Sequence, residues 1–367
     1  MFTGFVFAVL VLFTAAGCTR NENAGRQIST GGGEGIIAGG DNSRFTEVAI
    51  GPVAGKTDRD YQFAFSFGGV NPYADPVPGA ANDMAKILQI PDIIEQTPQH
   101  WEQNEQNVIL DAFIAQNIRG IFMMPSNATA ANAEITKIVK AGVPVVCMGG
   151  PPDDPTDALL TLATDVYQSA YDGTMAIIEK TGQKGNIVAL SGQISDPNTK
   201  ARFQASVDAC AKYPDVNLIQ QIGDIDDAEL SVTAVENLLA AQGDKINGII
   251  STAYYPSVAI ATYLADPKYS HIIGVGIDTD EKVLDAIRSG SIYGTMSQNP
   301  YGQGYICTLT LKMLADGWTY KSTESKHIDS GSFLITKDNI NDLDNLKIDV
   351  TNRILSTWVA RFNPPAN

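Results

Sequence analysis

From Tyr61 onward, short apolar runs alternate with longer segments in which apolar residues recur every three or four positions. Nearly unbroken apolar runs are typical of strands in a sheet that is covered on both faces, and the second pattern is typical of helices that pack one face on such a sheet. The runs are YQFAFSF, IRGIFMMP, VPVVCM, NIVALSG, NLIQQI, NGIIST, IIGVGID and IYGTMSQ. This alternation predicts an α/β fold with parallel sheets between helices.

Two of the intervening segments show the helical spacing clearly. Residues 80–88 place five apolar side chains on one face, and residues 128–140 place three more together behind two residues of the kind that cap helices, Ser126 and Asn127. A further helix is expected from 301 to 316. The apolar side chains of the first two helices are Ala80, Ala81, Met84, Ile87 and Leu88, and then Ile135, Ile138 and Val139.

Length and charge limit the classes of protein. A chain of 367 residues predicts about two domains. Its 25 basic and 41 acidic residues give a net charge of −16, which argues against attraction to nucleic acid or to an anionic membrane surface.

Residues 19–58 are rich in Gly, Asn, Ser and Thr and predict a flexible stalk. Within them, GGGEGIIAGG lacks the preceding strand and the following Gly-Lys-Ser/Thr of a phosphate-binding loop.

The first residues predict a secretory signal. Residues 5–16 are almost entirely apolar but too few to span a bilayer comfortably, and Gly17 and Cys18 follow them. The segment AAGC resembles the lipobox of bacterial lipoproteins, in which the cysteine is acylated. It departs from that pattern in Ala15, where Leu is usual, and in having no Lys or Arg before the apolar stretch. We expect a signal peptide at 1–18, acylation of Cys18 and a lipid-anchored extracytoplasmic protein; the alternative is a core helix.

The rest of the chain shows no motif that is typical of a catalytic or metal-binding site. Three cysteines in the body have no CxxC spacing and predict small buried residues instead of a metal site or a disulfide framework. The three histidines lie in unrelated contexts, and no G-x-S-x-G or HExxH motif is present. Adjacent carboxylates, such as Asp226 and Asp227, lie in polar turns and are expected to be solvated or to cap helices. We therefore expect no enzyme, no metal and no cofactor. These cysteines and histidines are Cys147, Cys210, Cys307, His100, His271 and His327.

Polar side chains gather where the predicted strands end. In open parallel sheets, ligands bind beyond the carboxyl ends of the strands. The segments at those ends carry amides, hydroxyls, carboxylates and aromatic rings but no histidine, which favours a site that binds over one that reacts. They are 66–73, 126–127, 148–150, 191–200, 252–255, 278–280 and 298–299.

The span from about 60 to 340 resembles the periplasmic sugar-binding proteins of the ribose and galactose type, which are the substrate receptors of ABC importers. FGGVNPY, GIFMMPSNATA, AGVPVV, ATDVYQSAYDG, NTKARFQA and VGIDTDEKVLDAIRSGSIYGTMSQNPYGQG carry the resemblance, in this order and spacing. It implies two similar Rossmann-like lobes that enclose a ligand and are joined by three crossings, near 164–165, 297–298 and 329–331. The lobes would be 59–163 with 299–328, and 164–298 with 329–367.

The resemblance also implies ligand-binding residues. Pro72 would hold Asn71 extended, so that its amide faces the cleft, and Tyr73 would lie against a sugar ring. Arg202 would bind neighbouring hydroxyls, and Asp278 would accept from others. Gln298 takes the amide position near a crossing, and Ser126, Asn127 and Tyr254 are added because they follow strands.

The Asn-Pro-Tyr segment, Arg202, Asp278 and Gln298 each have a structural alternative. The Asn-Pro-Tyr segment is also typical of a capping turn, Arg202 of a solvated helix surface, and Asp278 of a cap for the helix that begins near Glu281. Gln298 is also typical of a simple strand end. Trp101 is either a lid or stacking residue, or ordinary helix packing.

The chain departs from the ribose-type pattern at two places. A carboxylate and an arginine are replaced by Met148, Gly149 and Gly150, and an asparagine is replaced by Ala253 before Tyr254 and Tyr255. Polar contacts are lost and aromatic surface is gained. The ligand is therefore expected to be less hydroxylated than ribose, or larger and differently oriented.

The function implied by the resemblance is capture of a sugar or sugar-like small molecule for an ABC importer permease by a monomeric binding protein. Two alternatives stay open: a receptor for a membrane sensor or chemoreceptor, and a non-sugar ligand such as a nucleoside or a furanosyl autoinducer. A LacI-type repressor shares the fold but would carry a basic helix-turn-helix in place of the signal and stalk.

Overall fold

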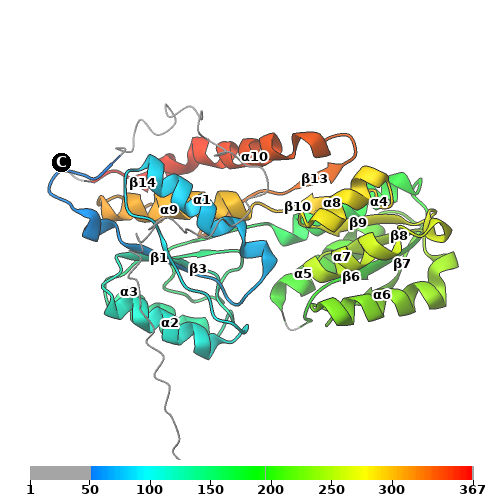
Figure 1. The fold of residues 1–367 in the computed structure, drawn as a ribbon, viewed down its shortest axis with the longest axis horizontal. Coiled ribbons are helices and arrows are strands. Elements are labelled where there is room, and N and C mark those ends of the chain that lie inside the picture. The colour runs from blue at the N-terminus through cyan, green and yellow to red at the C-terminus, as the bar shows by residue number, and fades with distance from the viewer. Residues whose placement is uncertain (1–50, 195, 366–367) are drawn as a thin grey trace, which may run out of the picture. The chain divides into compact units, whose positions relative to one another are not determined.

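The computed structural model describes residues 51–194 and 196–365 (Figure 1). The expected signal peptide, Cys18 and most of the expected stalk lie outside these residues. The end of the expected stalk packs on the first lobe, since Gly51 N donates to Leu88 O at 2.8 Å and Lys56 Nζ bonds to Ala315 O. The stalk boundary at 58 was therefore placed too late. In the described part, no helix is long and apolar enough to cross a membrane.

The first lobe contains a six-stranded sheet in the order β12-β5-β4-β3-β1-β2, in which every neighbouring pair is parallel. Three of its strands were predicted from apolar runs. The other three have only two or three residues each. The bounds are β1 (Phe63–Ser66), β2 (Ile94–Glu95), β3 (Gly120–Met123), β4 (Val145–Met148), β5 (Thr161–Ala163) and β12 (His327–Asp329).

Alternation along β1 shows why this sheet is covered on both faces. Phe63 and Phe65 point into a core built with α1 and α9, while Ala64 points into the core built with α2 and α3. The ring of Phe65 stacks on Phe122 of β3 at 4.8 Å between centroids. These helices are α1 (Pro76–Ile87), α9 (Pro300–Ala315), α2 (Gln103–Ala115) and α3 (Ala131–Lys140).

The second lobe repeats this plan. Its sheet has the order β13-β10-β9-β8-β6-β7, which matches the first sheet strand for strand, except that β13 runs antiparallel to β10. This repeat confirms the prediction of two similar α/β lobes. The strands are β6 (Gly185–Leu190), β7 (Val216–Ile222), β8 (Gly248–Ser251), β9 (Ile273–Ile277), β10 (Gly294–Ser297) and β13 (Phe333–Thr336); α4 (Val166–Lys180) and α5 (Pro197–Cys210) cover one face, and α6 (Ala228–Gln242), α7 (Tyr254–Tyr263) and α8 (Glu281–Ser289) the other.

The chain passes between the sheets at the three predicted places. After β5 ends at Ala163 in the first sheet, α4 begins at Val166 on the second. After β10 ends in the second sheet, α9 packs in the first lobe, as predicted for the helix at 301–316. Finally, β12 pairs in the first sheet and β13 in the second.

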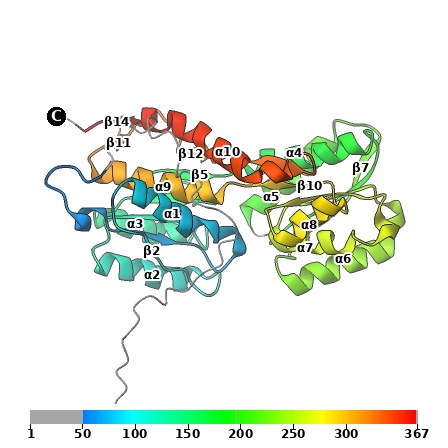
Figure 2. The same cartoon turned by 45° about the horizontal axis from the view of Figure 1, so that its top comes forward.

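Helix α10 (Leu343–Trp358) makes a fourth link between the lobes. It starts at Leu343, which packs on the second-lobe core, and ends at Leu355 and Trp358, which are buried in the first-lobe core (Figures 1 and 2). Beyond it, β14 (Phe362–Asn363) pairs with β11 (Thr319–Tyr320). The assignment of all of 329–367 to the second lobe is therefore wrong for the end of the chain, because its large apolar side chains complete the first-lobe core.

The middle of α10 lies against two of the crossings. The Asn299 side-chain amide donates to Ser330 O at 3.0 Å and to Thr351 Oγ1 of α10 at 3.2 Å. Gly331 has a φ of +80°, and a Cβ there would lie 2.5 Å from Val350 Cγ1 of the same helix. These two crossings and the middle of α10 therefore pack together.

Candidate functional site

Most of the predicted site residues follow the strands at which the order of each sheet reverses, and Asp278 and Gln298 follow β9 and β10, further along the second sheet. The chain moves from β1 to β2 on one side and then to β3 on the other, and it does the same around β6 with β7 and β8. Loops at such a switch point diverge and leave a crevice at the carboxyl ends of the strands. Asn71 and Tyr73 follow β1, Arg202 lies in the helix that follows β6, and Asp278 follows β9.

Asp278 is held firmly in an unusual backbone conformation. Its φ is +67°, which is uncommon for a residue other than glycine, although Asp tolerates it better than most. Asp278 N donates to Met296 O at 2.8 Å, and Thr295 Oγ1 donates to Asp278 O at 2.9 Å. The alternative that Asp278 caps α8 is wrong, because Asp280 is the cap and accepts from Lys282 N at 2.8 Å.

The carboxylate of Asp278 accepts a hydrogen bond of 2.8 Å from Gln298 Nε2. Burial raises the pKa of Asp278 to about 6, an effect that the Gln298 bond and the charge of Arg202 oppose and the charge of Asp226 supports. At neutral pH the group is therefore mostly ionised and accepts hydrogen bonds. Gln298 does more than end a strand, since it orients this carboxylate.

Arg202 has an unmatched donor. The side chain is partly buried on α5, and its Nε is inaccessible to solvent and has no acceptor among the described residues. A buried donor without an acceptor costs about 1–3 kcal/mol, which a ligand oxygen would relieve. The charge of Arg202 acts on Asp278 and on Tyr73. The alternative of a fully solvated helix-surface arginine does not hold.

Tyr73 is a first-lobe residue that lies near Arg202 and Asp278 of the second lobe. Its hydroxyl donates to Gln303 Oε1 at 3.1 Å, and its ring lies 6.0 Å from that of Phe67. Burial raises the pKa of Tyr73 above its usual value, and the charge of Asp278 raises it further while that of Arg202 lowers it. One residue of the first lobe thus lies within electrostatic reach of two residues of the second.

Asn71 has the extended backbone that Pro72 was expected to impose, with φ at −154°. Its Oδ1 accepts from Tyr73 N at 2.9 Å, which is the capping turn considered as the alternative. The side-chain NH₂ has no partner among the residues that the structure describes. The side-chain oxygen of Asn71 therefore fixes the turn that carries Tyr73, and its side-chain NH₂ is available to donate a hydrogen bond to a ligand.

Tyr254 begins α7 and donates from its hydroxyl to Asp280 Oδ2 at 2.6 Å. Burial raises the pKa of this hydroxyl, and the charges of Asp280, Asp278 and Asp75 raise it further. Asp75 belongs to the first lobe, so Tyr254 lies near both lobes. Its ring meets Tyr255 edge to face at 5.3 Å. The two rings supply the aromatic surface that the sequence predicts here.

Ser126 and Asn127 form hydrogen bonds that stabilise the loop after β3. Ser126 Oγ donates to Gly68 O at 2.6 Å, and Asn127 Oδ1 accepts from two backbone N–H groups of its own turn. The backbone N–H groups of both residues donate to glutamines of α2, Gln106 and Gln103, at 2.9 and 3.0 Å. Neither glutamine was predicted from the sequence. Their signal is their place on the buried face of α2, in line with apolar residues.

Trp101 covers the end of β1. Its ring meets Phe67 edge to face at 5.3 Å, and side chains at Gly68 and Gly69 would lie within 3 Å of the indole. The side chain remains 40% exposed. A Cβ at Gly149 would lie 2.7 Å from Met124 Sδ, so apolar surface occupies the place where the ribose-type pattern has charged residues.

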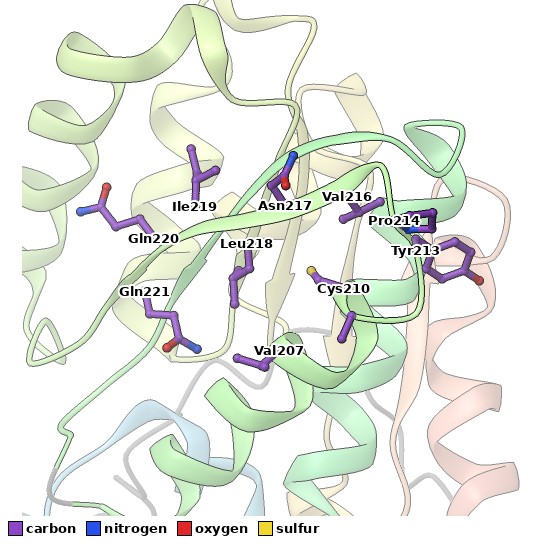
Figure 3. A pocket seen from close by; sticks show the side chains of 11 residues that line it. Val207, Cys210, Tyr213, Pro214, Val216, Asn217, Leu218, Ile219, Gln220 and Gln221 are labelled. Atoms are coloured by element: carbon purple, nitrogen blue, oxygen red, sulfur yellow. The ribbon is translucent and has the colours of Figure 1, made fainter.

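A hollow lies along the edge strand β7 and the end of α5 (Figure 3). None of the predicted site residues lines it. We assign the site to the strand ends instead, because the buried donor and the oriented carboxylate are found there. The hollow is lined by Val207, Cys210, Ala211, Tyr213, Pro214, Val216, Asn217, Leu218, Ile219, Gln220 and Gln221.

The cysteines of the described part are buried, as predicted, and they are free. Burial raises the pKa of Cys147 to about 12 and that of Cys210 to about 11, so these thiols are poor nucleophiles. Within residues 51–194 and 196–365, no three His, Cys, Asp or Glu side chains are grouped to hold a metal ion.

Comparison with known proteins finds relatives that are named as binding proteins. A D-apiose import binding protein from Paraburkholderia graminis is 25% identical over 228 residues, which are 62% of this chain and 72% of the relative. A xylitol-binding protein from Mycolicibacterium smegmatis is 25% identical over 190 residues, 52% of this chain and 54% of the relative. The aligned regions thus cover between about half and three quarters of these relatives.

Solved structures share the fold. A sugar-binding protein of a sugar ABC transporter from Bacillus halodurans superposes with a TM-score of 0.69 at 21% identity, over 77% of this chain and 98% of that one. A solute-binding protein from Burkholderia graminis in complex with D-arabinose gives 0.69 at 21%, over 78% and 98%. Residues 63–319 match the family described as the periplasmic binding protein domain, and the chain belongs to that family.

Proposed function

We propose that the protein is the extracytoplasmic substrate-binding component of an ABC importer and that it captures a monosaccharide or related polyol between its two lobes. The buried, unmatched Nε of Arg202 beside the oriented carboxylate of Asp278 carries this proposal. Relatives named for D-apiose and xylitol, and a structural neighbour holding D-arabinose, support the ligand class.

The chemistry of these residues suits a polyol. Each hydroxyl of a sugar is both a donor and an acceptor, so a site that offers guanidinium donors and a carboxylate acceptor satisfies neighbouring hydroxyls. Arg202 supplies the donors and Asp278 the acceptor. The rings of Tyr73 and Tyr254 provide surface for C–H groups, with their hydroxyls already bonded within the protein.

Ligand capture would close the lobes. A ligand that touches Tyr73 on the first lobe and Arg202 on the second binds the closed form best, and it therefore shifts the population toward closure. The importer permease would recognise that form. The protein acts as a monomer held at the membrane by lipid on Cys18.

A thermal-shift screen tests the ligand class. The panel contains D-apiose, D-arabinose, D-allose, xylitol and myo-inositol, with nucleosides and furanosyl signalling molecules as the competing classes. A ligand at about 100 times its Kd stabilises the folded protein by about 2.7 kcal/mol, and small-angle scattering should then show a more compact protein. Binding of a nucleoside or furanosyl compound with no response to any sugar or polyol would contradict the proposal.

A further inference from the structure

The loop between β7 and α6 carries three carboxylates in the sequence GDIDD, and two of them have structural partners. Asp224 accepts from Ile194 N at 2.9 Å, and its own N–H donates to Gly192 O at 2.7 Å. Asp227 caps α6 by accepting from Glu229 N and Leu230 N at 2.8 and 3.1 Å. The loop is therefore fixed on both sides of Asp226.

Asp226 itself has no hydrogen-bond or ion-pair partner in the described part of the chain. Its carboxylate lies over the end of β6, since a Cβ built at Gly192 would be 3.2 Å from Asp226 Oδ2. This is the strand that leads into α5 and Arg202. Asp226 is exposed on this fixed loop, and a carboxylate without a partner there, next to the strand ends of the candidate site, is available to a ligand.

The charges of the second-lobe residues are coupled. Although Asp226 is exposed at the surface, partial desolvation by its neighbours raises its pKa, the charge of Arg202 lowers it, and the charges of Asp196 and Asp227 raise it. Asp226 in turn acts on Asp278, as does Arg202. Arg202 thus influences a carboxylate on each of two loops, and in the described structure it forms an ion pair with neither.

We propose that Asp226 contacts the ligand and, together with Asp278, flanks Arg202, so that this half of the site accepts hydroxyl groups and rejects carboxylate and phosphate groups. The inference rests on the proposed function. An arginine alone would attract an anionic sugar through paired hydrogen bonds. Two carboxylates beside it make the net charge negative and repel an anion, while each accepts from a hydroxyl.

Calorimetry with matched neutral and anionic sugars tests the role of Asp226. The probes are D-arabinose and D-allose with their aldonates, and the variants are Asp226→Ala, Asp226→Asn and, as a matched control on the adjacent carboxylate, Asp227→Asn. Asparagine also caps helices, so the control should keep the fold. Circular dichroism checks each variant, and Asp226→Asn preserves the shape of the side chain if the alanine variant does not fold.

We expect the wild type to bind an aldose at least about tenfold more tightly than its aldonate. Asp226→Ala should weaken aldose binding about five- to a hundredfold, since a ligand hydroxyl loses its acceptor. Asp226→Asn should narrow the preference for the aldose over the aldonate, and Asp227→Asn should leave both affinities unchanged.

Two results would overturn this inference alone: unchanged aldose binding and aldonate preference in the Asp226 variants of a wild type that binds an aldose, or an equal effect of Asp227→Asn. The first would mean that Asp226 does not contact the ligand, and the second would mean that the effect comes from the net charge of the region. A wild type that binds none of the sugars or polyols of the screen would overturn the proposed function itself.

Discussion

The side-chain amide of Gln298 donates a hydrogen bond of 2.8 Å to the carboxylate of Asp278. Gln298 lies on one of the crossings between the lobes, and Asp278 directly follows β9 at the candidate site. The bond therefore joins the hinge to a proposed ligand acceptor. A movement of this crossing would change the orientation of the acceptor, which offers a direct route from lobe closure to ligand binding.

Asp278→Asn should stabilise the ligand-free protein at neutral pH. Burial raises the pKa of the folded Asp278 to about 6, whereas the unfolded carboxyl has a pKa of about 3.9. The folded state binds more protons between these values, so this group's contribution to stability is lost as the pH rises through about 6. Ionised Asp278 therefore lowers the free energy of unfolding by about 2–3 kcal/mol at neutral pH. Asparagine cannot ionise, so the variant does not have this loss, and asparagine also tolerates the positive φ.

Urea unfolding of wild type and Asp278→Asn near pH 4 and above pH 7 measures this difference. The stabilisation by Asn should be present at the higher pH and nearly absent at the lower one. An equal difference at both pH values would assign the effect to the backbone or to packing instead of to the charge.

Trp358→Ala should destabilise the protein by about 3–5 kcal/mol, because it leaves a cavity in the first-lobe core. The side chain is fully buried, and its Nε1 donates to Thr310 Oγ1 at 3.0 Å. Trp101→Ala is the matched control, since that ring is 40% exposed. Free energies of unfolding of the two variants should differ clearly; similar losses would contradict the place given to the end of α10 in the first-lobe core.

The fold was predictable where apolar runs are long. The strands at the centre of each sheet have such runs, whereas β2, β5 and β12 are too short to show one. The return of α10 to the first lobe was not predictable, because the spacing of Leu355 and Trp358 indicates a helix face but not the distant residues that it contacts. Those contacts are set by α9 and the first sheet.

The site was predictable only in part. Asp278 and Gln298 follow strand ends and Arg202 lies on the helix after β6, but the ligand contact that the resemblance implies for these residues stays a prediction. Ser126 was chosen for following a strand, and its hydrogen bonds to Gly68 and to α2 depend on residues far away in sequence. In GDIDD, the neighbouring carboxylates look alike in sequence, and only their contacts single out Asp226.

Cys18→Ser should release the mature protein from membranes. One acyl chain holds a protein weakly, and two or three hold it firmly, at about 0.8 kcal/mol for each buried CH₂. Serine removes the acceptor of these chains. Cys210→Ser, in the body of the protein, is the control and should leave membrane association unchanged. Cell fractionation measures the outcome, and a processed Cys18→Ser protein in the membrane fraction would reject the lipid anchor.

Calorimetric titration of Arg202→Ala with the sugar found in the screen tests the central claim most directly. Loss of the guanidinium leaves ligand hydroxyls unpaired and should cost about 1–3 kcal/mol, or about five- to a hundredfold in affinity. Arg353→Ala, which removes the same charge from the exposed surface of α10, should bind like the wild type. If Arg202→Ala is folded and binds the sugar as tightly as the wild type, the strand ends around Arg202 are not the ligand site.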